Sequence, residues 1–324
     1  MTYVALPEEM QYRLPFYLAM EEYVAREFPA QEFFFMWQVE PTVIFGRNQL
    51  VESEVDIEYC KSNDIQFYRR KSGGGCVYAD KSNIMLSYIS PSTNVNFTFN
   101  RYMLMIEHAL QKLGVDARTS GRNDILIDGR KISGNAFYHL PERSIVHGTM
   151  LYDTNLEFMA KATTPSDSKL KSKGVNSVRQ HVTTLNRYIS ITIEELKHHI
   201  REELCSDSIV LSQKDIDAIE KIEPGYYEPS FIYGNNPAYS ILKNRRINGV
   251  GEFWMSMEVR NNTIRKIDLK GDFFLVGDLD SMLLSKLCNI PLEREAIEKA
   301  IEDTDCGDII MNLTKEQLIN LITD

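Results

Sequence analysis

The sequence predicts an α+β fold divided into a large N-terminal domain and a small C-terminal one. A chain of 324 residues suits one large domain joined to a smaller one. Helical and strand-like apolar patterns both occur before residue 225. Glycines and prolines then cluster between Gly225 and Pro237, as they do in a linker. We therefore expect a first domain at 1–243 and a second at 244–324.

The expected elements of the first domain follow from apolar spacing. Leu14 to Phe28 predicts a helix that ends before Pro29. Further strands are expected at Phe33–Trp37, Thr42–Phe45, Ile84–Ile89 and His147–Tyr152, with helices at Val55–Lys61, at the apolar stripe Tyr102–Leu113 and after the capping box Thr192–Glu195. This mixture of helical and strand-like spacing of apolar residues indicates a sheet covered by helices.

The second domain is expected to begin with a hairpin. Apolar residues alternate from Gly251 to Val259, Asn261-Asn262 supplies a turn, and Thr263 to Leu269 forms the return strand. Two helices are expected to follow, the last of them starting at the capping box Thr314–Gln317.

Composition excludes several classes of protein. The formal net charge is −10, whereas a nucleic-acid binder needs a basic surface. No apolar run is long enough for a membrane span, and the N-terminus lacks the features of a signal peptide. The 5 cysteines include no CxxC pair, which favours a reducing compartment. We expect a cytoplasmic monomer with no nucleic-acid or membrane partner.

The most informative stretch is a glycine-rich loop at Arg69–Tyr78, Arg-Arg-Lys-Ser-Gly-Gly-Gly-Cys-Val-Tyr. It follows the strand-like run 65–68 and is expected to form the turn of a hairpin. Three successive glycines allow a tight bend, and their N–H groups can form a concavity that binds an anion. The two arginines at the entrance add positive charge. The loop therefore indicates an acyl or phosphoryl guest, with a plain turn as the alternative.

A second informative run ends in the hairpin turn Asp128-Gly129. With a two-residue loop, Ile127 opposes Arg130 and Leu126 opposes Lys131. Alternation along the strands then places Asp124, Lys131 and Ser133 on one face. A carboxylate and an ammonium in this position form either a structural ion pair or a metal ligand beside a catalytic cation. The residues alone leave both open.

Two further features have both structural and functional interpretations. His147 lies in an expected strand, where a lone histidine is more often a hydrogen-bonded core residue than a catalyst. The segment Lys169–Arg179 is basic within an acidic chain. It is either a solvated loop or a mobile cationic flap that covers an anion.

Taken together and in this order, these motifs resemble the lipoate–protein ligase A family of the biotin/lipoate ligase superfamily. The similarity combines the glycine-rich loop, the run Gly121–Gly134 and the His-Gly-Thr strand with the Lys-Gly-Val-Asn-Ser-Val-Arg loop that follows it. It extends from about Leu18 to Leu185, and the tail resembles the family's accessory domain. The resemblance implies a mixed-sheet catalytic domain with helices, plus a small C-terminal α+β accessory domain.

The resemblance also implies a two-step reaction. Lipoic acid and MgATP first give lipoyl-adenylate and pyrophosphate. The lipoyl group is then transferred to a lysine of a lipoyl domain, either on a 2-oxoacid dehydrogenase acyltransferase or on the glycine-cleavage H protein. Cations near the α-phosphate would offset the repulsion between two anions.

Residues that match the family's motifs take their expected roles from it. Lys131 is the expected catalytic residue, in contact with both the α-phosphate and the lipoyl carbonyl. The residues expected to bind ATP or the adenylate are Arg70, Gly75, Cys76, Val77, Tyr78, Asn83, Asn123, Lys131, Lys173 and Gly174. Those expected to bind lipoate are Leu18, Met20, Trp37, Arg70, Ser72, Met85, Lys131 and His147. Asp124 is the expected Mg²⁺ ligand.

The sequence departs from the family pattern after the loop. Members commonly carry His-Asp there, and this chain has Ala79-Asp80. A methyl group in place of an imidazole is expected to widen the acyl pocket or to change its preference among lipoate, octanoate and related acids. The phosphate-binding residues are unaffected.

Related architectures supply the alternatives. Octanoyl- and lipoyl-transferases use a cysteine nucleophile without ATP, and Cys76 is the cysteine closest to the motifs. Biotin ligases share the architecture but differ in the hairpin and the tail. A non-catalytic lipoate-binding protein would be expected to lack Lys131 or Asp124, and both are present.

Overall fold

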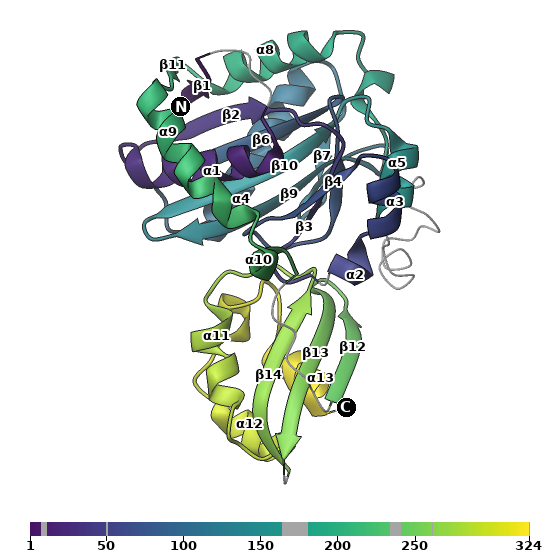
Figure 1. Ribbon diagram of the computed structural model, residues 1–324, viewed down its shortest axis with the longest axis vertical. Helices are drawn as coiled ribbons and strands as arrows, with labels where there is room; N and C mark the ends of the chain where they lie inside the picture. The colour runs from purple at the N-terminus through teal and green to yellow at the C-terminus, as the bar shows by residue number, and fades with distance from the viewer. Residues whose placement is uncertain (8–11, 50, 164–180, 234–240, 261, 324) are drawn as a thin grey trace.

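The computed structural model describes the chain except for residues 8–11, 50, 164–180, 234–240, 261 and 324. Figure 1 shows two lobes. The larger N-terminal lobe contains an eight-stranded sheet, a second sheet of three strands and helices, and the smaller lobe contains a three-stranded sheet with helices. The expected α+β fold in two parts is confirmed.

The large sheet is mixed. Its strands in spatial order are β11 (Asp207–Val210), β1 (Thr2–Ala5), β2 (Phe33–Trp37), β6 (Asn83–Ser90), β10 (Arg143–Leu151), β9 (Arg130–Leu140), β8 (Asp124–Ile127) and β7 (Arg118–Thr119). Strand β1 is parallel to both of its neighbours. The pairs from β2 onward are antiparallel.

Helices cover both faces of this sheet. One face is covered by α1 (Leu14–Glu27) and α9 (Gln213–Ile222), and the other by α4 (Val95–Lys112) and α8 (Ile193–Leu204). Helix α1 has a proline in its first turn, where a missing N–H is harmless. The capping box expected at Thr192 is present at the start of α8. Two apolar cores result, one on each side of the sheet.

The glycine-rich loop does not close a hairpin, and that expectation was wrong. It joins β4 (Gln66–Arg69) to β5 (Val77–Ala79), and β3 (Thr42–Phe45) lies between these two strands. Strand β3 is parallel to β4 and antiparallel to β5. The loop therefore crosses the end of β3, and a pattern read along the chain gives no sign of this insertion.

Short helices surround the small sheet. They are α2 (Val51–Glu54), α3 (Ile57–Ser62) and α5 (Leu156–Ala162), followed by a 3₁₀ turn at Leu185–Arg187. Helix α3 starts later than expected because the Asp56 side chain caps it by accepting a hydrogen bond from Tyr59 N at 2.8 Å.

The hairpin between β8 and β9 is as predicted. Asp128 and Gly129 have φ of 51° and 72°, the left-handed values that a two-residue turn of this type requires. Ile127 pairs with Arg130 and Leu126 with Lys131. A bulge between Ile125 and Leu126 then shifts the register. The bulge places Asp124 opposite Gly134, beside the Lys131 side chain.

The expected linker contains helical turns. A 3₁₀ turn at Glu223–Tyr226 and helix α10 (Pro229–Tyr233) precede residues 234–240, which lie outside the described part. Helix α10 lies where the two lobes meet (Figure 1). Strand β12 (Ile241–Ile247), which the sequence did not predict, follows, so the expected boundary between residues 243 and 244 falls inside this strand.

The C-terminal lobe has its own apolar core. Strands β12, β13 (Gly251–Arg260) and β14 (Thr263–Gly271) form its sheet, and the predicted hairpin is confirmed. The helical elements are α11 (Leu279–Met282), 3₁₀ turns at Leu284–Leu287 and Cys306–Asp308, α12 (Arg294–Ala300) and α13 (Lys315–Thr323). The capping box is present, since Thr314 Oγ1 accepts from Gln317 N at 3.2 Å.

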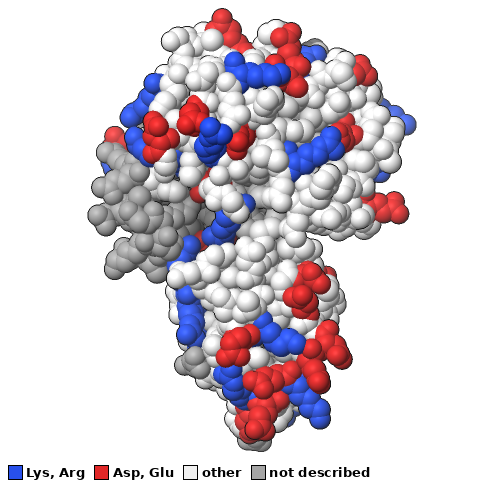
Figure 2. All heavy atoms as spheres, turned by 180° about the vertical axis from the view of Figure 1, so that it is seen from behind, with Lys and Arg blue, Asp and Glu red and all other residues white. Residues whose placement is uncertain are grey.

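Figure 2 shows the charged side chains on the reverse face. Both signs are interspersed over the upper lobe, whereas Asp and Glu gather toward the free end of the lower lobe. Within the described ranges, no helix combines the length and the hydropathy needed to cross a membrane.

Buried tyrosines predict a loss of stability at alkaline pH. Burial raises the pKa of Tyr102 and Tyr138 above the usual value of 10.0. Their neutral forms therefore stabilise the fold fully below pH 10, and this contribution falls as the pH rises from 10 toward the folded-state pKa. Denaturant unfolding at pH 9, 10 and 11 should show constant stability up to about 10 and a decline above it.

Tyr102→Phe provides the control for this prediction. The Tyr102 hydroxyl makes no hydrogen bond within the described residues, so its removal leaves no partner unpaired. The variant should lose stability less steeply above pH 10, and an unchanged slope would contradict the assignment.

Candidate functional site

A cavity of about 170 Å³ lies at the end of β3 and the glycine-rich loop, against α1 and the large sheet. Most of the residues singled out in the sequence contribute to its lining. These are Leu18, Trp37, Arg70, Gly75, Cys76, Val77, Tyr78, Met85, Asn123, Lys131 and His147. Segments far apart in the chain thus supply one cavity.

One part of the lining is apolar. Leu18 from α1, Trp37 from β2 and Met85 from β6 are all buried and belong to one core cluster. The Trp37 ring stacks on Tyr17, with 4.7 Å between ring centroids. These contacts hold the indole in place and leave apolar surface facing the cavity, as binding of an alkyl chain requires.

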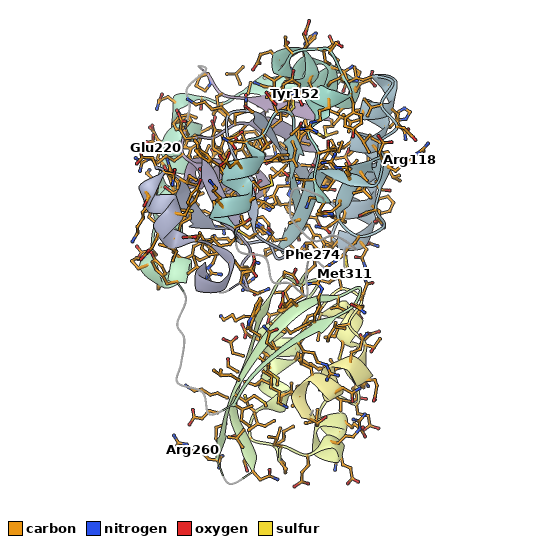
Figure 3. All side chains as sticks on the ribbon, turned by 90° about the vertical axis from the view of Figure 1, so that its right-hand side faces the viewer. Arg118, Tyr152, Glu220, Arg260, Phe274 and Met311 are labelled. Atoms are coloured by element: carbon orange, nitrogen blue, oxygen red, sulfur yellow. The ribbon has the colours of Figure 1, made fainter. Side chains whose placement is uncertain are left out.

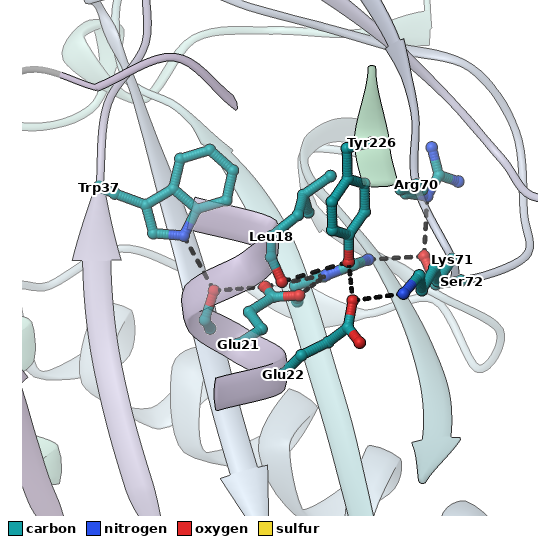
Figure 4. Close-up of polar contacts among 10 residues, drawn as sticks. Leu18, Glu21, Glu22, Trp37, Arg70, Lys71, Ser72 and Tyr226 are labelled. Atoms are coloured by element: carbon teal, nitrogen blue, oxygen red, sulfur yellow. Dashed lines mark hydrogen bonds and ion pairs between the residues drawn. The ribbon is translucent and has the colours of Figure 1, made fainter. Parts of the chain in front are cut away.

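A chain of buried hydrogen bonds supports this part of the lining (Figure 4). Trp37 Nε1 donates to Ser87 Oγ at 2.9 Å, and Ser87 Oγ donates to Glu21 at 2.6 Å. His147 Nδ1 lies 2.9 Å from Glu21 Oε2, and its Nε2 lies 2.6 Å from Ser72 Oγ. Because the Glu21 carboxylate accepts a hydrogen bond from Nδ1–H, Nε2 is assigned as the acceptor of a hydrogen bond from the Ser72 hydroxyl.

Arg70 completes this network from the loop side. Its Nε donates to Ser72 Oγ at 2.9 Å, and its Nη atoms donate to the carbonyl oxygens of Ile44, Gly73 and Gly75. Burial lowers the pKa of Arg70 to about 10, so the guanidinium stays charged at neutral pH. Arg70 therefore fixes the shape of the glycine-rich loop as well as lining the cavity.

Arg69 and Lys71 point away from this network. Arg69 donates to the carbonyl oxygens of Gly46, Arg47, Gln49, Phe231 and Ile232, at 2.7 to 3.0 Å. It joins the small sheet to α10, so the expectation that both arginines charge the loop entrance was wrong for Arg69. Arg69 is the last residue of β4, and the loop that follows it directs Arg70 and Ser72 to the cavity network.

Lys71 joins a buried carboxylate on α1. Its Nζ lies 2.6 Å from Glu22 Oε1 and 4.9 Å from the centre of the Tyr226 ring. The Tyr226 hydroxyl also hydrogen-bonds Glu22 (Figure 4). Arg26 Nη2 lies 3.0 Å from the same carboxylate. Burial, followed by Glu22, raises the pKa of Tyr226. This cluster holds α1, the loop and the start of the linker together.

Lys131 forms an ion pair with Asp124, one of the two arrangements that the sequence left open. Its Nζ lies 2.8 Å from Asp124 Oδ1, and both side chains are mostly buried. His181 Nε2 lies 3.6 Å from Asp124 Oδ2 and also lines the cavity. Thr183 N donates to Lys131 O at 2.9 Å, which holds the segment of His181 along the end of β9. The ammonium therefore has a fixed position on a rigid ribbon.

Gly134 gives Lys131 its space. A Cβ atom on Gly134 would overlap with Lys131 Nζ and Cε. Gly134→Ala is expected to displace the ammonium while the fold persists, because a flexible chain end can move aside. Since small misplacements of catalytic groups reduce rates by about a hundredfold, a loss of at least tenfold in turnover is expected.

Steady-state turnover and thermal unfolding of Gly134→Ala test this prediction together. Gly129→Asn is the matched control, because the hairpin turn has open space around its Cβ position and asparagine tolerates a positive φ. Unchanged turnover in Gly134→Ala would show that the position of Lys131 is not critical.

Several predicted residues do not line the cavity. Met20 is buried in the core, because residues two apart on a helix lie on nearly opposite sides. Asn83 donates to Tyr78 O at 3.2 Å and thereby braces β5 from behind. Ser72 and Asp124 are buried partners of residues that do line it. Lys173 and Gly174 lie outside the described residues, as does most of the segment Lys169–Arg179.

Ala79 is fully buried in β5 and is not among the lining residues. It belongs to the same core cluster as Leu18, Ile44 and Met85, directly behind the cavity wall. An effect of this position on acyl preference would have to act through those neighbours.

Other lining residues were missed by the sequence analysis. They are Leu14, Ile44, Glu54, Gly74, Arg122, Gly134, Asn135, Ala136, Gly148, Thr149, Leu151, Met159, Thr163, His181, Val182, Asp272 and Phe274. Arg122 stands next to Asn123 in a run already singled out, so its charge was a usable signal. Asp272 and Phe274 come from the other lobe, and no motif marks them.

The C-terminal lobe reaches the glycine-rich loop. Gly74 N donates to Phe273 O at 3.0 Å, and Gly74 has a φ of 86°. Phe274 stacks on Phe137 of β9, with ring centroids 5.7 Å apart. The Gly74 amide thus donates to a carbonyl of the second lobe, whereas the sequence suggested an open concavity for an anion.

Family models match both lobes of this chain. Residues 14–205 match the lipoyl protein ligase A/B catalytic domain, and residues 236–322 match the bacterial lipoate protein ligase C-terminus. The chain belongs to the lipoate–protein ligase family. As a member of this family it is an enzyme of the ligase class, and the expected resemblance is confirmed.

Curated relatives agree over nearly the full length. The ligase is 32% identical to lipoate-protein ligase LplJ of Bacillus subtilis, with 94% of this chain and 95% of the relative covered. It is 33% identical to lipoate–protein ligase 1 of Staphylococcus aureus, again over 94% and 95%.

Solved structures share the fold. LipL1 of P. falciparum, in complex with lipoate, has a TM-score of 0.78 at 20% identity and covers 100% of this ligase and 98% of its own chain. A lipoate-protein ligase A bound with ATP has a TM-score of 0.63 at 23% identity, covering 72% and 98%. A bipartite ligase from Thermoplasma acidophilum, described with its E2 lipoyl domain, has a TM-score of 0.64 at 24% identity, covering 74% and 98%.

Proposed function

We propose that this ligase activates free lipoate with ATP to lipoyl-adenylate and then transfers the lipoyl group to a lysine of a lipoyl domain. The observation that carries the proposal is one cavity that joins apolar walls to a fixed ammonium, Lys131. An alkyl chain suits the walls around Leu18, Trp37 and Met85. The Lys131 ammonium can stabilise the negative charge at the point where the acyl group is joined to the α-phosphate.

Lys131 is assigned the central role in both steps. Attack of a carboxylate on the α-phosphate brings two anions together, and a nearby ammonium stabilises the charge that builds up. The same charge polarises the acyl carbonyl when the acceptor amine attacks it. Since Asp124 orients Lys131 at 2.8 Å, the ammonium needs no rearrangement at the moment of reaction.

The nucleotide is assigned to the wall built by the glycine-rich loop and β5. Gly75, Cys76, Val77 and Tyr78 line this wall, and Asn83 supports it. Asn123 lines the cavity next to Lys131. ATP as substrate is supported by the shared fold with a ligase bound with ATP. Lys173 and Gly174 are also proposed to bind the adenylate.

Mg²⁺ is proposed as the companion of ATP. Among the residues that the structure describes, no group of three or more His, Cys, Asp and Glu side chains could hold a metal ion. A single carboxylate, Asp124, nevertheless fits an ion that is held mainly by substrate phosphates. When bound, the ion would neutralise phosphate charge.

Lipoyl domains are the proposed acceptors. The T. acidophilum ligase is described with its E2 lipoyl domain, and that pairing supports the same class of acceptor here. We assign acceptors on 2-oxoacid dehydrogenase acyltransferases or the glycine-cleavage H protein. The ligase is proposed to act as a cytoplasmic monomer.

Pyrophosphate release tests the function. Purified ligase with lipoate and MgATP should release pyrophosphate, and an added lipoyl domain should gain a lipoyl group on its lysine, detected by mass. Omission of ATP provides the control. Transfer of the lipoyl group from a carrier protein without ATP, abolished by Cys76→Ser, would instead establish a transferase.

A further inference from the structure

The C-terminal lobe contacts the cavity through one short segment. We call residues 272–275, which follow β14, the accessory turn. Figure 3 places Phe274 of this turn at the boundary between the lobes. Asp272 and Phe274 both line the cavity, so a segment of the accessory domain forms part of the wall beside Arg122 and Asn123.

Donors of the catalytic domain face acceptors of the accessory domain at this contact. Gly74 N donates to Phe273 O at 3.0 Å. Arg122 Nη2 donates to Val250 O at 2.5 Å and lies 3.5 Å from Asp272 O. Gly74 belongs to the glycine-rich loop and Arg122 to the run that precedes β8, and both segments line the cavity. Each acceptor is a backbone carbonyl of the second lobe.

Arg122 also packs against the accessory turn. Its guanidinium lies over the Phe274 ring, 5.4 Å from the ring centre. Burial lowers the pKa of Arg122, and the Asp272 carboxylate opposes this effect. An arginine retains its charge under such conditions. A partly buried guanidinium beside Asn123 and Lys131 is the kind of group that binds phosphate oxygens.

Asp272 adds a carboxylate to the acceptor side, with Arg246 as a nearby counter-charge. It is 4% exposed. Its Oδ1 accepts from Glu252 N at 2.5 Å, and its Oδ2 lies 3.6 Å from Arg246 Nη1. The accessory turn and Val250 thus present carbonyl oxygens together with a carboxylate. That is the pattern of acceptors and charge that a polyphosphate would present to the same donors.

We propose that Arg122 and the Gly74 amide bind the β- and γ-phosphates of ATP, and that the accessory turn competes with these phosphates for both donors. The inference rests on the proposed use of ATP. The single N–H of Gly74 serves one acceptor at full strength, so a phosphate oxygen must displace the Phe273 carbonyl there. At Arg122 the phosphate competes for Nη2, the atom that contacts the carbonyl oxygens of Val250 and Asp272. The Asp272 carboxylate also repels a polyphosphate from the cavity. Release of the turn and binding of the triphosphate are therefore coupled.

Binding measurements on the full chain test the competition. The probe is an ATP analogue with a methylene group between the α- and β-phosphorus atoms, with Mg²⁺ and without lipoate, followed by calorimetry. Asp272→Asn removes the charge and keeps the Oδ1 acceptor for Glu252 N. It should bind the analogue about fivefold more tightly, the low end of usual coupling between sites. Arg122→Gln should bind it at least tenfold more weakly, since charge-assisted bonds to phosphate are strong.

Matched variants separate these effects from a general change of charge. Asp268→Asn removes a carboxylate of β14 that pairs with Lys270 at 3.3 Å, and Arg118→Gln removes an exposed arginine of β7. Neither residue is part of the cavity lining, and both variants should bind the analogue like the parent. AMP, which lacks the outer phosphates, should bind equally to the parent and to Asp272→Asn.

The possible results are distinct. Unchanged or weaker binding of the analogue by Asp272→Asn overturns the competition, and unchanged binding by Arg122→Gln overturns its role as a phosphate ligand. Inorganic tripolyphosphate should give the same ranking as the analogue. A parent enzyme that binds neither the analogue nor AMP would overturn the proposed use of ATP itself, while tripolyphosphate would still test the accessory turn.

Discussion

Lys131→Gln is expected to reduce lipoate-dependent pyrophosphate release by about a hundredfold or more, because removal of one preorganised group that stabilises developing charge has effects of that size. The ammonium is fixed 2.8 Å from Asp124 on a rigid hairpin, and glutamine cannot supply its positive charge at that position. Stopped-time assays with saturating lipoate and MgATP measure the rate. Lys161→Gln, at an exposed ion pair on α5, should keep the parent rate.

A double variant separates catalysis from stability. Loss of Lys131 leaves the buried Asp124 carboxylate without its closest cation, which should lower the free energy of unfolding by roughly 2–4 kcal/mol. Lys131→Gln combined with Asp124→Asn should recover much of this loss, because the unpaired charge is gone. It should remain inactive. Recovery of activity in the double variant would contradict the assigned role of Lys131.

Arg69→Lys is expected to lower the free energy of unfolding by about 3–5 kcal/mol, since several charge-assisted hydrogen bonds are lost together. One ammonium cannot reach the carbonyl oxygens of Gly46, Gln49 and Ile232 at once, and they lie on both sides of the guanidinium. The Phe45 ring, 4.7 Å from the Arg69 guanidinium carbon, loses its planar partner. Urea unfolding followed by circular dichroism measures the change.

The matched control for Arg69 is Arg118→Lys on β7. The Arg118 side chain is 67% exposed and pairs with an equally exposed Asp116. Exposed pairs contribute little, so this variant should change stability by less than about 0.5 kcal/mol. If Arg69→Lys were as stable as Arg118→Lys, the bonds from Arg69 to α10 would have no role in holding the linker.

Elements with a strong local signal could be predicted from the sequence. The limits of α1, the turn at Asp128-Gly129 and the capping box at Thr192 all depend on neighbouring residues, and all were confirmed. The nearness of Lys131 to Asp124 followed from the same hairpin, although the sequence left open whether they form an ion pair or a metal site. Side chains that a local rule places on one ribbon can be located without the rest of the fold.

Features that depend on distant segments were missed. Strand β3 inserts between β4 and β5, and no local pattern records which strands become neighbours. Asp272 and Phe274 join the cavity only because the second lobe docks there. Glu21 lies within the helix predicted at Leu14–Phe28, but its partnership with His147 depends on the packing of that helix against the sheet. These features were missed because they depend on tertiary contacts, and not because the local secondary-structure propensities were weak.

The alternation along residues 69–72 restricts how this enzyme can be re-engineered. Arg69 and Lys71 hold the linker side, whereas Arg70 and Ser72 face the cavity network. Strand β4 ends at Arg69, so the directions of the side chains at 70–72 depend on the path of the loop. Insertion or deletion of a residue within 69–72 would change which side chains reach the linker side and which reach the cavity network. Grafts that exchange this segment between relatives must therefore preserve its length, whatever residues they carry.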